Sequence, residues 1–140
     1  MSLIDWSDAL SLGVPGIDAQ HQRLVSMLND LYAAVLALRG QSEITAILSS
    51  MVAYSQEHFT FEESEMARCR YAEEKLHRAE HHAFIEFAEK TEARMKAGEF
   101  VSSVELLGYL RDWLTNHIQS VDRKYCSALR TCQPAEGAAS

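Results

Sequence analysis

The sequence predicts an all-α protein, an up-down-up-down antiparallel four-helix bundle with an N-terminal arm. The two prolines, Pro15 and Pro134, stand near the ends of the 140-residue chain, so none interrupts the long stretch between them. Apolar residues in that stretch recur at spacings of three and four, which is the period of a helix. The links between the helical stretches are short, and short links make successive helices antiparallel neighbours.

The first two helices are expected at about 17–39 and 43–69, after an arm formed by residues 1–16. Gly40 is expected to end the first helix as a C-terminal glycine. The apolar stripe of the first helix consists of Leu24, Leu28, Leu31, Val35 and Leu38. The stripe of the second begins with Ile44, Ile47, Met51 and Tyr54.

The last two helices are expected at about 73–97 and 102–128. Glu73 and Glu74 suit the positive N-terminal end of the third helix. Ser102 followed by Glu105 forms a capping box that opens the fourth. Residues 133–140 have nothing to pack and are expected to be a flexible tail. The chain is long enough for one domain with a real core, and we expect a single domain over residues 1–132.

Composition and charge restrict the class of partner. The chain is 47% hydrophobic and 24% charged, as in globular proteins. Its net charge is −7, and its basic residues are scattered among acidic ones, which argues against nucleic-acid binding. The longest apolar run near a helix centre, LYAAVLAL, is far short of the roughly 18 residues that span a membrane. We therefore expect neither nucleic acid nor membrane as a partner.

The N-terminal segment and the cysteines bear on localisation. No Lys or Arg precedes Arg23, whereas a secretory signal begins with basic residues, so we expect the protein in the cytoplasm. Cys69, Cys126 and Cys132 form no C-x-x-C pair, and any disulfide scheme leaves one of them unpaired. In the cytoplasm we expect all three thiols to be reduced.

Polar residues interrupt the apolar stripes of all four expected helices. Residues four apart share a helix face, so His58 pairs with Glu62 and His77 with His81. In an up-down bundle the start of one helix meets the end of the next, and this places the interruptions at one end of the bundle. His82 points away and is expected at the surface. The five histidines on the stripes are His21, His58, His77, His81 and His117.

This cluster predicts a metal centre. Buried polar atoms need partners, and five imidazoles with the carboxylates of Glu62 and Asp122 are too many for accidental pairing. A tetrahedral zinc ion takes about four ligands, whereas two ions bridged by carboxylates use all seven. Nitrogen-rich ligation with bridging oxygen suits iron, and manganese or cobalt less well.

One spacing does not fit a regular helix. His117 and Asp122 are five residues apart, and their directions would differ by about 140° on an α-helix. Either a local π-turn aligns the two side chains, or they approach the metals from opposite flanks. The sequence leaves both possibilities open.

The order and spacing of these residues resemble a known family. His21, His58-x-x-x-Glu62, His77-x-x-x-His81 and His117-x-x-x-x-Asp122 match the hemerythrin ligand pattern. The stretch DWSDALSLGVPGIDAQHQRL looks like the opening of bacterial hemerythrins, and the resemblance covers about residues 5 to 126.

The resemblance implies a non-haem centre of two iron ions. His77, His81 and His117 would ligate one iron, and His21 and His58 the other. Glu62 and Asp122 would bridge the two, together with an oxo or hydroxo group from solvent. The second iron would then have an open sixth position for dioxygen.

The expected function is therefore reversible oxygen binding for carriage, storage or sensing, with no residue in a catalytic role. The resemblance implies an apolar oxygen pocket, for which Ile118 and Val121 fit an ordinary core position equally well. The residues expected to line it are Leu24, Phe59, Trp113, Leu114, Ile118 and Val121.

Two other readings remain open. A diiron enzyme could turn over peroxide or nitric oxide at the same centre. Ferritin-like enzymes, however, use four carboxylates and two Glu-x-x-His motifs, and only Glu74-x-x-His77 has that spacing here. An iron-homeostasis or signalling module would act through a partner protein that the sequence does not identify.

Overall fold

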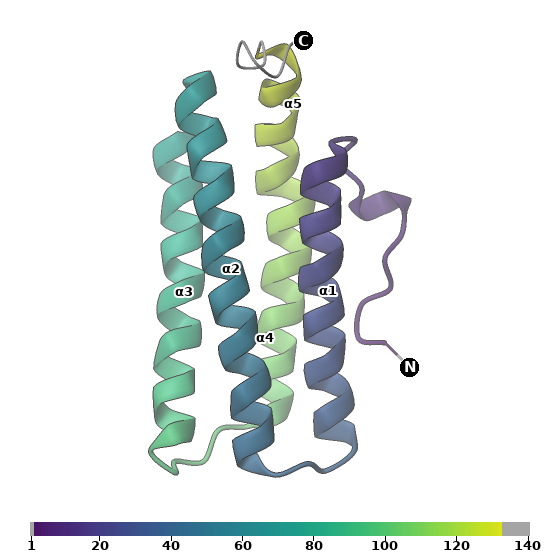
Figure 1. Ribbon diagram of the computed structural model, residues 1–140, viewed down its shortest axis with the longest axis vertical. Helices are drawn as coiled ribbons and strands as arrows, with labels where there is room; N and C mark the ends of the chain where they lie inside the picture. The colour runs from purple at the N-terminus through teal and green to yellow at the C-terminus, as the bar shows by residue number, and fades with distance from the viewer. Residues whose placement is uncertain (1, 133–140) are drawn as a thin grey trace.

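Four helical rods run antiparallel along the long axis of the computed structural model, which describes residues 2–132 (Figure 1). Three rods are single α-helices: α1 (Pro15–Leu36), α2 (Gln41–Cys69) and α3 (Glu74–Lys96). The fourth is continuous and consists of α4 (Ser103–Asn116), the π-helical segment η2 (His117–Asp122) and α5 (Arg123–Thr131). The predicted all-α four-helix bundle is confirmed. The tail expected at 133–140 lies outside the described residues.

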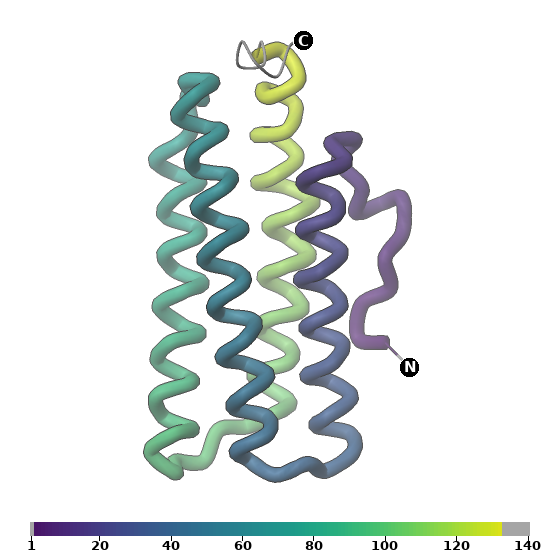
Figure 2. Tube along the Cα trace, viewed as in Figure 1, coloured from purple at the N-terminus to yellow at the C-terminus, as the bar shows by residue number. Residues whose placement is uncertain are grey.

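The N-terminal arm runs along the outside of α1 (Figure 2) and contains the short 3-10 helix η1 (Asp8–Leu10). Asn29 of α1 holds the arm in place. Its Oδ1 accepts hydrogen bonds from the backbone N–H groups of Leu3 (2.9 Å) and Ile4 (3.0 Å), and its Nδ2 donates to the carbonyl of Ile4 (2.9 Å). These bonds fix the arm beside the middle of α1.

The helix ends differ in detail from the sequence expectations. Leu38, with φ 56°, adopts the left-handed conformation after α1. Gly40, which was expected to close α1, has φ −65° and is the N-cap of α2. The capping box of the fourth rod is present, since the Ser102 side chain accepts a hydrogen bond from the backbone N–H of Glu105 (3.3 Å).

The core lies between the four apolar stripes. Burying such a leucine stabilises the fold by roughly 2 kcal/mol. Among the described residues, the leucines with 0% exposure are Leu28, Leu31, Leu48 and Leu110. None of the helices in the described chain combines the length and hydropathy that crossing a bilayer requires.

The structure corrects the expectation that all three cysteines are reduced. Cys69, at the end of α2, and Cys132, directly after α5, form a disulfide with their Cα atoms 5.5 Å apart. The two helix ends meet in the fold although the cysteines are 63 residues apart, and sequence spacing does not reveal this. Cys126 is free and buried. Burial, with the nearby Asp122 and Glu62 carboxylates, raises the pKa of its thiol to about 12.

Candidate metal centre

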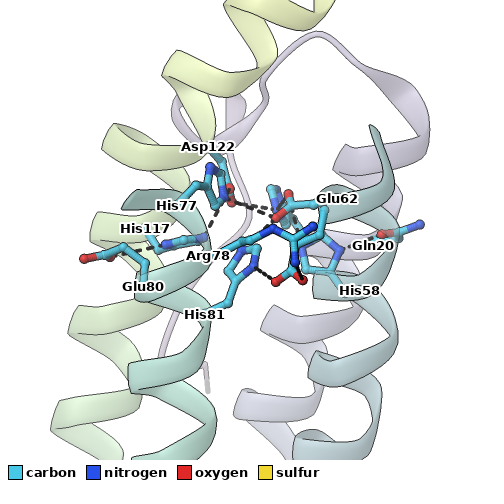
Figure 3. A network of polar contacts seen from close by, with 11 residues as sticks. Gln20, His58, Glu62, His77, Arg78, Glu80, His81, His117 and Asp122 are labelled. Carbon is cyan, nitrogen blue, oxygen red and sulfur yellow. Dashed lines mark hydrogen bonds and ion pairs between the residues drawn. The ribbon is translucent and has the colours of Figure 1, made fainter. Parts of the chain in front are cut away.

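The seven polar residues singled out in the sequence meet at one level of the bundle (Figure 3). Helix α1 contributes one, α2 two, α3 two and η2 two. Each of them is at most 2% exposed. They are His21, His58, Glu62, His77, His81, His117 and Asp122. His82, in contrast, is exposed, as the sequence predicted.

The spacing of His117 and Asp122 is explained by a π-helix. Residues His117–Asp122 form η2, in which hydrogen bonds join residues five apart. This widened turn directs both side chains to the same face, with His117 Nε2 and Asp122 Oδ1 3.2 Å apart. Of the two arrangements that the sequence left open, the fold adopts the π-turn.

Glu62 lies between two groups of histidines. Its Oε2 faces His21 Nε2 at 3.6 Å and His58 Nε2 at 3.4 Å. Its Oε1 faces His77 Nε2 at 3.5 Å and His81 Nε2 at 3.1 Å. The two oxygens of one carboxylate therefore serve different groups.

Asp122 divides its oxygens in the same way. Its Oδ2 lies 3.0 Å from His21 Nε2. Its Oδ1 lies 2.9 Å from His77 Nε2 and 3.2 Å from His117 Nε2. The site thus consists of a three-histidine group (His77, His81 and His117) and a two-histidine group (His21 and His58), which share both carboxylates.

Many of these converging atoms lack hydrogen bonds among the described residues. They include the Nε2 atoms of His21, His58, His77 and His117, one oxygen of Glu62 and both of Asp122. His21 Nε2 and Asp122 Oδ2 lie 3.0 Å apart, and His77 Nε2 and Asp122 Oδ1 lie 2.9 Å apart, yet neither pair forms a hydrogen bond. Buried polar atoms without partners are costly. Separations of about 3 Å are those of neighbouring ligand atoms, each ~2.1 Å from a shared cation. The donor set therefore fits a pair of metal ions.

The electrostatics of the site also favour bound cations. Burial opposes the charge on Glu62, but the surrounding imidazoles, His58 first among them, hold its pKa well below its usual range. The pKa of Asp122 is lowered against the effects of burial and of Glu62, by His117 and His21. Burial lowers the pKa values of His21 and His77, but contacts with Asp122 and Glu62 outweigh it and raise both to about 9. Without metal, protons on imidazoles balance the carboxylates, and cations can replace those protons.

A second set of polar side chains holds the imidazoles from behind, and sequence reasoning missed it. Glu63 Oε2 accepts from His81 Nδ1 at 2.8 Å, and Gln20 Oε1 accepts from His58 Nδ1 at 2.6 Å. Glu80 Oε1 lies 3.5 Å from His117 Nδ1. Such bonds fix the ring with Nε2 directed inward. Their positions in the sequence could have indicated them, because each of these residues directly neighbours a site residue.

Aromatic rings pack directly on two of the histidines. Phe59 stacks on His81 with ring centroids 3.9 Å apart and an interplanar angle of 7°. Trp113, which is half-buried, stacks on His117 at 4.4 Å and 11°. The expected oxygen-pocket residues Phe59 and Trp113 thus lie against imidazoles of the three-histidine group.

The other expected pocket residues divide into buried and peripheral ones. Leu24, Leu114 and Ile118 are at most 3% exposed. Val121 is half-buried and lines a surface hollow of about 370 Å³ together with Leu76 and other residues. Val121 therefore lies at the periphery of the fourth rod, and its expected role in the oxygen pocket stays a prediction. The π-turn rotates Val121 outward while it brings Asp122 in.

Comparison with known proteins agrees with this geometry. The hemerythrin HHE cation binding domain matches residues 12–129. The bacteriohemerythrin of Stenotrophomonas maltophilia (strain R551-3) is 34% identical over 130 residues, which are 93% of this chain and 84% of that protein. The bacteriohemerythrin of Pseudomonas aeruginosa (strain LESB58) is 36% identical over the same shares of the two chains.

Solved structures give the same result. A wild-type hemerythrin crystal structure superposes with a TM-score of 0.83 at 33% identity, covering 91% of this chain and 98% of that chain. The fold, the shared-carboxylate site and the sequence relationship agree, and the resemblance seen in the sequence is confirmed. The chain belongs to the hemerythrin family.

Proposed function

We propose that the chain holds two iron ions at this centre and binds dioxygen reversibly. The observation that carries the proposal is the division of the carboxylate oxygens. Glu62 and Asp122 each present one oxygen toward His21 and the other toward His77, as ligands that bridge two ions would. Family membership supports the same assignment.

The three-histidine group would hold one iron, and the two-histidine group the other. The cluster consists of imidazole nitrogens and carboxylate oxygens, a donor set that suits iron. When bound, the ferrous pair supplies the two electrons for reversible reduction of dioxygen. Because the groups differ by one imidazole, the two-histidine side would leave a coordination position for dioxygen.

The protein's own contribution is to orient the ligands and exclude water. The site residues are almost fully buried, and apolar residues cover the site along the bundle axis, with Leu24 one turn after His21 and Leu114 three residues before His117. A dry surround limits the entry of water and anions that would displace the bound ligand. Five imidazoles with only two carboxylates favour binding of dioxygen over the oxidative turnover of carboxylate-rich enzymes.

Metal analysis and absorption spectroscopy test this proposal. The iron-loaded protein should contain two irons per chain. After reduction with dithionite, exposure to air should produce ligand-to-iron absorption bands that disappear on removal of oxygen and return with it. Oxidation that is complete after one exposure and cannot be reversed by removing oxygen would contradict reversible binding.

A further inference from the structure

The imidazoles of the two groups differ in what holds them from behind. In the three-histidine group, His81 and His117 face carboxylates, Glu63 and Glu80. In the two-histidine group, His58 faces the neutral amide of Gln20. The Nδ1 of His21, like that of His77 in the three-histidine group, has no hydrogen-bond partner among the described residues. The hydrogen-bonding shell is therefore asymmetric, beyond the difference in histidine count.

Glu63 is held in place more firmly than Glu80. Its Oε2 accepts from His81 Nδ1 at 2.8 Å, and its Oε1 accepts from Arg78 Nη1 at 3.2 Å. Arg78 is in turn fixed by Glu74, with Nε and Oε2 2.8 Å apart. These contacts connect α2, which carries Glu63, with α3, which carries Arg78 and His81. The Glu63 side chain is only 20% exposed, so water competes weakly for it.

Glu80 is a weaker partner for His117. Its side chain is 48% exposed, and its Oε1 lies 3.5 Å from His117 Nδ1, at the outer limit of a hydrogen bond. The strong charged contact in the shell is therefore the one between Glu63 and His81.

The nature of the acceptor matters to the metal. An imidazole that donates its Nδ1–H to a carboxylate becomes a more basic ligand at Nε2, and its ring is held in one tautomer and orientation. A neutral amide also fixes the ring but donates less electron density. Removal of such a partner typically costs 10- to 100-fold in metal affinity.

We propose that Glu63, held by Arg78, is a positioning residue for His81 that makes the three-histidine position the first of the two to fill. The two-histidine position fills second and releases its ion first. Of its two Nδ1 atoms, that of His58 is bonded to Gln20, and that of His21 has no partner among the described residues. This inference rests on the proposed two-metal centre. The ion at the two-histidine position, next to the dioxygen position, would then be the one that exchanges more readily.

Anaerobic titration of the metal-free protein with cobalt(II) tests the order of filling. In the wild-type protein, cobalt absorption should rise in two steps, with the first at least about tenfold tighter in competition with a chelator. Glu63→Gln keeps the size of the side chain and removes its charge. It should weaken the first step by about 10- to 100-fold and leave the second unchanged. Equal weakening of both steps, or of neither, would overturn the proposal.

Two further variants separate this role from a general effect on folding. Glu86→Gln removes an exposed carboxylate of α3 that pairs only with Lys90 in the described structure, and it should leave both steps unchanged. Gln20→Glu gives His58 a carboxylate partner and should strengthen the second step, so that the two steps approach each other. If Glu63→Gln fails to fold, the Gln20→Glu variant decides alone. A second cobalt-binding step that is unchanged or weaker in Gln20→Glu then overturns the proposal.

The reduction potential of the iron-loaded centre is a further measurement, which would not change if Glu63 had only a structural role. A carboxylate-backed imidazole favours the more oxidised metal, so Glu63→Gln should raise the reduction potential of the iron-loaded centre, and Glu63→Asp should partly restore it. An unchanged potential in Glu63→Gln counts against the role of Glu63. Binding of fewer than two cobalt ions by the wild-type protein would instead defeat the proposed two-metal function itself.

Discussion

His117 and Asp122 are five residues apart, yet His117 Nε2 and Asp122 Oδ1 lie within 3.2 Å of each other in the core. The π-helix His117–Asp122 makes this possible by adding one residue to the turn. In α2, by contrast, His58 and Glu62 achieve the same alignment with the regular spacing of four. The widened turn therefore accommodates an extra residue without moving the ligand after it.

This relationship predicts that the extra residue can be removed. Deletion of the exposed Gln119 should convert η2 into an α-helical turn in which the histidine and the aspartate are four apart and still share a face. The variant should retain two metal ions per chain, as measured by elemental analysis. Deletion of the exposed Asp112 from the regular helix α4 is the matched control. It should turn the following residues by about 100° and abolish metal binding. Loss of both ions in the Gln119 deletion would contradict this view of the π-turn.

The shared carboxylates predict an unequal effect of removing ligands. Glu62→Ala removes a ligand from both groups, so metal content should fall below one ion per chain. His58→Ala removes a ligand from one group and should leave about one ion. Glu65→Ala is the control, because Glu65 is also on α2 but pairs with Arg68. This variant should retain two ions. Two full equivalents of metal in purified Glu62→Ala would rule out its bridging position.

Leu114 is expected to protect the oxygenated centre. It is 3% exposed and lies three residues before His117 on the fourth rod. Leu114→Ala should open space for water and speed autoxidation at least several-fold, while the iron content stays at two. Leu→Ala changes in a core typically cost about 2–5 kcal/mol of stability.

Leu107→Ala serves as the control, because Leu107 is also a buried leucine of α4 but lies two turns farther from His117. It should lower stability comparably without affecting the decay of the oxygenated spectrum. Equal autoxidation rates in the wild-type protein and in Leu114→Ala would remove Leu114 from the oxygen pocket.

The pKa values of the metal-free site predict how its stability depends on pH. The folded pKa of both His21 and His77 is about 9, above the ordinary 6.5. Their contribution to stability is fully present below about 6.5 and is lost as pH rises through about 9. Glu62 and Asp122 have lowered pKa values, so their contribution is present above their ordinary values near 4 and is lost in stronger acid.

The metal-free protein should therefore lose unfolding free energy between pH 6 and 9.5, by up to about 3 kcal/mol for each of the two histidines. Urea unfolding of the metal-free protein across this range measures the effect, with α-helical circular dichroism as the signal. Metal affinity should have the opposite dependence and rise with pH, because the imidazoles must lose protons to ligate. Greater stability of the metal-free protein at pH 9.5 than at pH 6 would contradict the assigned charges.

Helical periodicity explains why so much of the fold and the site could be predicted. The stripes of apolar residues define the bundle, and residues four apart, such as His77 and His81, must share a face. The inward turn of Asp122 and the outward position of Val121 both depend on the π-turn, which periodicity does not encode. The Cys69–Cys132 disulfide depends on the meeting of two distant helix ends.

The hydrogen-bonding shell was missed for a related reason. Glu63 and Gln20 lie beside the apolar stripes, where the pattern alone indicates a solvated face. Each reaches an imidazole on another helix, His81 on α3 and His58 on α2, and these contacts depend on how the helices pack. Sequence spacing within one helix cannot specify them.

The central claim is that Glu62 and Asp122 bridge two metal ions, and diffraction from crystals of the iron-loaded protein at the iron absorption edge tests it most directly. We predict two anomalous peaks in each chain, one at the Nε2 atoms of His21 and His58 and the other at those of the three-histidine group. Each carboxylate should place one oxygen at each peak. A single peak, or a carboxylate with both oxygens on one ion, would contradict the bridged two-metal centre.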